Sequence, residues 1–144
     1  MPDFNVTASK SNYLEEKIIK FMITRSESGF IMPDTFYIGL WNEILLNSST
    51  GNTPGEVSTS GTGYSRYEYI NNTNSWTFEP PNIMKNTNDI IYNRAQSNWG
   101  TVRSLAILDN SNNILFFSNL SSSIVVNNLN TVYIPANNLI ITEY

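Results

Sequence analysis

The sequence contains no cysteine and no histidine. Without cysteine the chain has neither a disulfide framework nor a thiolate metal site. Histidine is the commonest general base and the commonest metal ligand, so its absence removes both roles at once. We therefore expect a protein that is not an enzyme, with no catalytic residues, no metal site and no cofactor.

Charged residues are scarce as well. They make up 14% of the 144 residues, against a typical share of about a quarter, and the net charge is −4. An acidic chain without a stripe of Lys and Arg is a poor partner for a phosphate backbone, so no nucleic acid is expected to bind. Surface polarity must come from Asn, Ser and Thr, which suits close-packed assemblies and sugar contacts. A biased genome composition is the alternative explanation of the Asn content.

Long apolar runs are also missing. None approaches the roughly twenty residues that a membrane-spanning helix needs. The first residues, Met1-Pro2-Asp3, do not begin the basic-then-apolar pattern of a signal peptide. We therefore expect a soluble intracellular product with no membrane partner.

The clearest pattern that is present predicts a long β-hairpin around a turn at residues 109–113, where Asp and Asn favour a tight reversal. A short apolar run can also be a buried helix segment, but the turn residues beside it favour strands. Alternation predicts that the first arm is buried on both faces. Val102, Ala106 and Leu108 are expected on one face of the strand, and Leu105 and Ile107 on the other.

Further short strands are predicted along the chain, with long polar loops at 47–63 and 71–88. Gly39 lies inside the first of these strands and indicates a bulge or a close backbone approach. Several short strands separated by turn residues at intervals of about 8–12 residues are typical of an antiparallel sandwich. The predicted fold is therefore mainly β, a single jelly-roll-like β-sandwich with one N-terminal α-helix. The predicted strands are 35–41, 64–70, 76–78, 89–95, 124–126, 131–134 and 138–142.

The N-terminal part is predicted to be an arm followed by a helix. Residues 1–11 are expected to be extended or a short edge strand, and residues 12–144 to form one domain. Asn12 is the expected N-cap of a helix at 12–25, which Ser26-Glu27-Ser28-Gly29 ends. Its apolar stripe either packs over an open side of the sheet or docks a neighbouring subunit. The stripe comprises Leu14, Ile18, Ile19, Phe21 and Met22.

The sequence holds only weak patterns for a metal site or a catalytic site. The alternation that begins at Asp109 resembles the start of a calcium loop, but Ile114 stands where the required glycine belongs, so a plain turn is favoured. Two carboxylates could cleave a glycoside, yet nothing in the sequence brings any pair together. The candidates for such a pair are Asp34, Glu43, Glu56 and Glu68.

Aromatic residues are the best candidates for contact with a ligand. They either fill the core or stack on sugar rings, because an aromatic ring serves both purposes. The possible contact residues are Trp41, Trp76, Tyr64, Tyr67 and Tyr69.

An ordered set of short motifs resembles a family of small tailed-bacteriophage virion proteins that are labelled tail-fibre or minor structural proteins. The resemblance covers about residues 12–142, and it implies a structural role without catalysis. Asn137 departs from it, where the family often has Gly. The motifs are Tyr37-Ile38-Gly39-Leu40, Pro54-Gly55-Glu56, Gly61-Thr62-Gly63-Tyr64-Ser65-Arg66, Asn98-Trp99-Gly100-Thr101-Val102, Leu105-Ala106-Ile107-Leu108-Asp109 and Thr131-Val132-Tyr133-Ile134-Pro135-Ala136-Asn137-Asn138-Leu139.

This resemblance leads to the expected function, a non-enzymatic subunit of a tail fibre or of a tail appendage or adaptor. A capsid decoration protein and a carbohydrate-binding module are the alternatives. The expected partners are other phage virion proteins, further copies of the chain and a host surface glycan. The expected location is the virion, after assembly in the host cytoplasm.

Overall fold

The computed structural model describes residues 4–24 and 31–143. The predicted end of the helix at Ser26–Gly29 lies outside these residues. The helical elements are α1 (Asn12–Ile19) and the π-helical turn η1 (Lys20–Thr24). The strands are β1 (Val6–Lys10), β2 (Thr35–Trp41), β3 (Tyr67–Ile70), β4 (Trp76–Glu79), β5 (Ile83–Asn86), β6 (Ile90–Ile91), β7 (Gly100–Leu108), β8 (Ile114–Val126), β9 (Tyr133–Ile134) and β10 (Leu139–Thr142).

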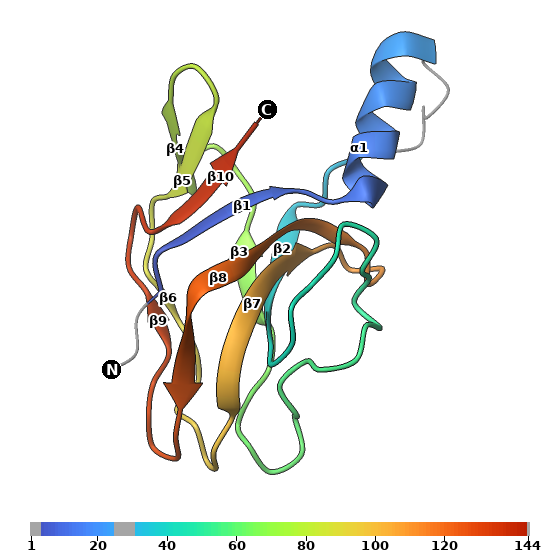
Figure 1. Cartoon of the computed structure of the whole chain (residues 1–144). Coiled ribbons are helices and arrows are strands. Elements are labelled where there is room, and N and C mark those ends of the chain that lie inside the picture. Colours follow the sequence, from blue (N-terminus) through green and yellow to red (C-terminus); the bar gives the residue numbers. More distant parts are fainter. Residues whose placement is uncertain (1–3, 25–30, 144) are drawn as a thin grey trace.

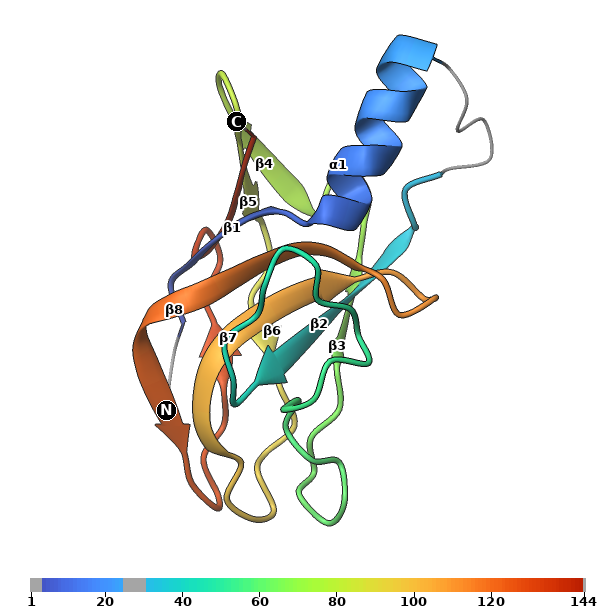
Figure 2. The same ribbon diagram turned by 45° about the vertical axis from the view of Figure 1, so that its right-hand side comes forward.

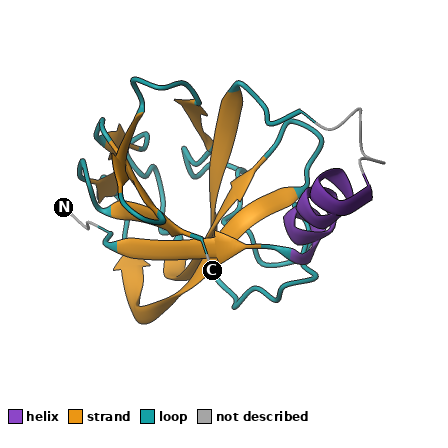
Figure 3. Cartoon of the chain, turned by 90° about the horizontal axis from the view of Figure 1, so that it is seen from above, coloured by secondary structure: helices purple, strands orange, loops and turns teal. Residues whose placement is uncertain are grey.

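Most of the strands belong to one large, curled sheet. Its order is β3-β2-β7-β8-β1-β10-β5-β4, and β6 pairs separately with β9. The pairs are antiparallel except for β1 and β10, which run parallel. The sheet bends so that its two halves enclose the core (Figures 1 and 3). This confirms the predicted mainly β, sandwich-like fold with one helix.

The predicted hairpin is formed by β7 and β8 at the centre of the sheet. Asp109 closes its turn, because one carboxylate oxygen accepts the backbone N–H groups of Ser111 and Asn113, both at 2.9 Å. The carboxylate is thus engaged with its own loop, as expected for a plain turn rather than for a calcium loop.

Strand β7 is buried on both faces, as predicted. Leu105 and Ile107 lie in the main core, while Ala106 and Leu108 lie in a second cluster on the opposite face. The prediction for Val102 was wrong, because this residue joins the main core instead of the second cluster. The pairing of β7 with β8 is irregular directly after Val102, and such an irregularity breaks the alternation of sides.

The second cluster exists because the segment that follows β2 folds back over the outer face of the sheet. Figure 2 shows this segment, in teal and green, crossing in front of β2 and β7. It adds a partial outer layer that supplies apolar cover. The buried members of the cluster are Trp41, Leu45, Ala106, Leu108, Ile114 and Phe117.

The N-terminal segment is an interior strand, so the prediction of an arm or edge strand for residues 1–11 was wrong for its described part. β1 lies between β8 and β10 in the sheet. Phe4, Val6 and Ala8 point inward and are at most 1% exposed. The error has a physical cause: β1 pairs with strands that are more than one hundred residues away, and no local pattern shows such pairing.

The helix begins at the predicted place but has a different cap. Ser11, not Asn12, is the N-cap, and its hydroxyl oxygen accepts the backbone N–H of Leu14 at 3.2 Å. The same hydroxyl donates to the carbonyl of Ile114, which ties the cap to the first residue of β8. Only the first turn is therefore anchored deeply, with Leu14 fully buried, and the rest of the helix rises away from the sheet (Figure 2).

Other boundaries differ from the sequence prediction in length. Within the segment 71–88, the strand expected at 76–78 is confirmed as β4, but β5 was not predicted, so the part expected to be a loop is half of a hairpin. The strand expected at 89–95 is reduced to β6, and the strand expected at 124–126 is the end of the long β8. The Ser-rich residues 118–123 also belong to β8, although Ser and Asn are weak strand formers; Ser118 and Asn119 pair with β7, and pairing resumes at Ile124.

Candidate functional site

An ion pair holds the loop at 47–63 against the body of the protein. Glu56 accepts two bonds from Arg66, from Nε at 2.9 Å and from Nη2 at 2.8 Å. Arg66 also donates to the side-chain oxygen of Asn112 at 2.6 Å and to the carbonyl of Gly51 at 3.1 Å. Its guanidinium lies over the ring of Trp41. One arginine thus joins the loop, the hairpin turn and the sheet.

Tyr64 completes this polar cluster from the core side. Its hydroxyl donates to Glu56 at 2.7 Å and accepts the backbone N–H of Leu40 at 2.9 Å. Burial raises the pKa of the Tyr64 phenol, and the nearby Tyr92 and Glu56 raise it further. The phenol stays protonated at neutral pH, so it acts as a fixed hydrogen-bond donor in the cluster.

Gly39 makes the close approach that the sequence indicated. A Cβ atom at this position would lie 2.8 Å from the ring of Trp41 and 3.1 Å from a carboxylate oxygen of Glu56. Only glycine leaves room here for the loop to reach the sheet. The cluster is therefore a structural clamp built into the strand itself.

Breaking this clamp is expected to destabilise the protein. Replacing Arg66 with Met should lower the free energy of unfolding by about 2–4 kcal/mol, because Glu56 would keep a partly buried charge without its partner. The matched control is Glu79→Gln, which removes the exposed ion pair with Lys85 and should cost under about 1 kcal/mol. Urea unfolding of both variants measures the difference, and equal costs would contradict the clamp.

The five predicted contact residues differ in solvent exposure. Trp41, Tyr64 and Tyr69 are buried, so their rings serve the interior. Tyr67 and Trp76 are half-buried and reach the surface. The rings of Tyr69 and Trp76 meet edge to face, 5.2 Å apart between centroids, so these two are brought together. Contact with a sugar stays a prediction, and the structure leaves it open chiefly for Tyr67 and Trp76.

The four acidic candidates differ in their surroundings. Glu56 is paired with Arg66, while Asp34, Glu43 and Glu68 are exposed. Among residues 4–24 and 31–143, no group of three or more Asp or Glu residues is arranged to hold a metal ion. Neither helical element of these ranges is long and apolar enough to cross a membrane.

Large apolar side chains are exposed on the hairpin of β4 and β5 and on the helix, whose apolar stripe the sequence had already offered as a docking element. On the hairpin, the cross-strand neighbours Phe78 and Met84 are both exposed. The outer part of the helix is defined here as the helix surface. It comprises Ile19, Phe21, Met22 and Ile23.

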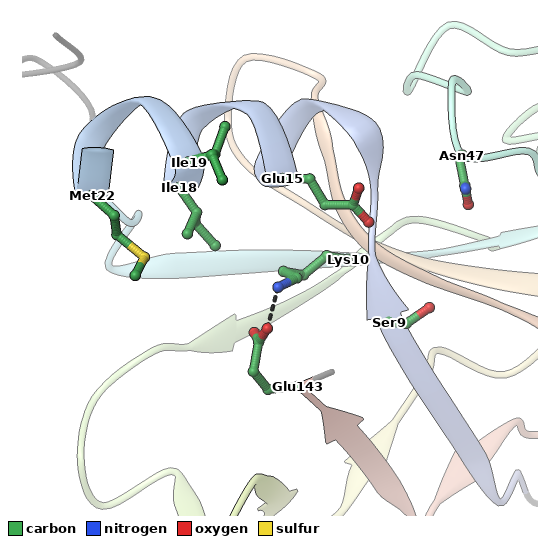
Figure 4. Close-up of a pocket in the computed structure, with 8 residues that line it drawn as sticks. All are labelled: Ser9, Lys10, Glu15, Ile18, Ile19, Met22, Asn47 and Glu143. Atoms are coloured by element: carbon green, nitrogen blue, oxygen red, sulfur yellow. Dashed lines mark hydrogen bonds and ion pairs between the residues drawn. The ribbon is translucent and has the colours of Figure 1, made fainter. Parts of the chain in front are cut away.

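A groove runs beside the helix (Figure 4). It has a volume of about 540 Å³ and lies between the helix, β1 and the C-terminal strand. Ile18 and Met22 point from the helix toward the ion pair of Lys10 and Glu143 on the other side. The groove thus has a helical wall that is mainly apolar but carries Glu15, and an opposite wall that carries the ion pair of Lys10 and Glu143.

Comparison with known proteins identifies a family for the chain. A family model described as Podophage GP4 fiber I protein gp80 matches residues 9–142. No curated protein matches the chain. The matched residues include the helix, the clamp and nearly all of the sheet. The chain therefore belongs to the family described as Podophage GP4 fiber I protein gp80, a family of phage virion fibre proteins.

Proposed function

We propose that this chain is a non-enzymatic structural subunit of a tail fibre, or of an appendage or adaptor that joins a fibre to the tail. Membership of the fibre family makes it a component of the virion that associates with other virion proteins. The observation that carries the proposal is the family match along residues 9–142. Assembly in the host cytoplasm, in several symmetry-related copies, is part of the same proposal.

The arrangement of the molecule supports a role through contact. The clamp of Glu56, Tyr64 and Arg66 holds the longest loop on the sheet. Exposed apolar side chains project at the helix and at the hairpin of β4 and β5. A firm body with projecting apolar elements is suited to joining neighbours in an assembly.

A host glycan is proposed as a further partner. Tyr67 lines a hollow of about 320 Å³ beside β3, together with polar side chains such as Asn72 and Asn74. An aromatic ring next to amide groups suits a sugar, since the ring stacks on it and the amides bond its hydroxyls. Tyr67→Ala should then weaken binding of whole particles to host glycans without changing their assembly.

The copy number in purified particles tests the tail location against a capsid decoration. Quantitative mass spectrometry should find on the order of ten copies or a few tens for a tail part, and on the order of hundreds for a shell decoration. A count in the hundreds would replace the tail proposal by the decoration. Absence from purified particles would contradict a virion role of either kind.

A further inference from the structure

Among residues 4–24 and 31–143, the helix surface is left largely uncovered. Its four side chains are 58–72% exposed, whereas Leu14, in the first turn of the same helix, is fully buried. Figure 2 shows the helix rising from the end of the sheet. Large apolar side chains gathered on one projecting element mark a contact surface, unlike apolar residues scattered singly.

The length of the helix strengthens this point. α1 and η1 together run from Asn12 to Thr24, and only the first turn packs deeply against the body. A helix of fewer than about 12–15 residues is marginal in water unless its apolar face packs against something. A partner that covers the outer turns would therefore stabilise them.

We propose that this partner is the same helix of a second copy of the chain. The helix of each copy lies in the groove of the other, so a two-fold axis satisfies both grooves at once. The inference rests on the proposed function only in that a virion fibre subunit acts in several copies. It names the surface through which two copies meet.

The groove fits a helix of this kind in its chemistry. Its helical wall presents Ile18, Ile19 and Met22, which suit the apolar side of an incoming helix. Its charged residues are one lysine, Lys10, and two glutamates, Glu15 and Glu143, which gives a net charge of −1. The mainly apolar helical wall and the opposite wall with its ion pair match an amphipathic element, as in other helix-in-groove contacts.

The charge on the polar side of the helix is complementary to the groove. Helical spacing places Glu16, Lys17 and Lys20 away from the groove-lining residues, and their net charge is +1. Glu16 and Lys20 form an ion pair at 2.9 Å along this side. A docked helix therefore brings a positive edge to a negative groove, which favours a second copy as the occupant.

The available area is sufficient for a specific contact. A large side chain offers about 200 Å² when fully exposed, so the four residues of the helix surface present on the order of 500 Å². Two copies bring about 1,000 Å², in which the groove residues Ile19 and Met22 are already included, and this reaches the lower size of a specific interface.

Sedimentation velocity of the full chain over a range of concentrations tests this inference. The unmodified chain should associate reversibly, and Met22→Lys or Ile23→Lys should weaken association by about tenfold or more. Both side chains are exposed, so circular dichroism should show an unchanged fold. The matched control is Leu129→Lys, which alters an equally exposed side chain in the turn between β8 and β9, at the other end of the molecule (Figure 1). It should leave association unchanged.

Hydrogen exchange provides a second test of association through the helix. Backbone amides of residues 20–23 should exchange quickly in dilute solution and slowly in the associated state. A chain that stays monomeric at all concentrations would overturn the inference, as would association that the helix variants leave intact. Protection of the helix only in whole particles would assign it to another virion protein. None of these results affects the copy-number test of the virion role.

Discussion

A chain that begins at Asn12 is expected to be largely unfolded. The truncation removes β1, which hydrogen-bonds to β8 on one side and to β10 on the other. It also removes Phe4, Val6 and Ala8 from the core. Burial of each large side chain contributes about 1.5–3 kcal/mol, and a domain has only about 5–15 kcal/mol of net stability. Loss of a whole interior strand should exhaust that margin.

Circular dichroism and thermal unfolding measure this effect. The truncated chain should lack a cooperative transition. A single substitution gives a finer comparison: Ala8→Asp places a charge in the core, while Thr7→Asp places one at an exposed position of the same strand. The first should destabilise the protein by several kcal/mol and the second by less than about 1 kcal/mol. A truncated chain that melts cooperatively would show that β1 is dispensable, as an arm would be.

Replacing Leu105 or Ile107 with Ala is expected to cost about 2–5 kcal/mol of unfolding free energy. Both side chains are fully buried in the main core, and β7 lies between β2 and β8 in the sheet. The cavity left by either change is enclosed on all sides, so little relaxation is available to fill it. Urea unfolding measures the cost.

The control for these two changes is Arg103→Ala, at an exposed position of the same strand. It should change the unfolding free energy by less than about half a kcal/mol. A similarly small cost for Leu105→Ala would mean that one face of the strand is open to solvent.

The parts of the fold that the sequence predicted well are those set by neighbouring residues. The alternation in 35–41 matches β2 residue for residue, and the polar turn at 109–113 joins β7 to β8. Both depend on interactions within a short stretch of chain: side-chain alternation for the strand, and Asp109 bonding its own loop for the turn.

The parts that it missed depend on distant residues. β1 is recognisable only through its pairing with β10, at the far end of the chain. The side of Val102 changes because of an irregularity between two strands, which no single-strand pattern shows. The sequence predicted the strand at 76–78 but missed β5, because β5 is organised by its pairing with β4 and with β10.

For the candidate site too, the sequence predicted what depends on neighbouring residues and missed what depends on distant ones. The aromatic residues of 64–69 were identified as candidates, but burial depends on the folded chain, and Tyr64 and Tyr69 lie inside. The clamp of Glu56 and Arg66 joins a loop to a strand, which residue types alone do not reveal. The amphipathic helix was visible in the sequence. That its outer turns lie beyond the sheet became clear only in three dimensions.

We propose that this chain works in the phage particle through contact alone, and a three-dimensional reconstruction of the intact virion is the measurement that decides it. The subunit should lie in the tail or its fibres, with the helix surface covered by a neighbouring copy. The proposal fails if the subunit is missing from the particle, or if it contacts no neighbour and turns over a substrate at its own side chains.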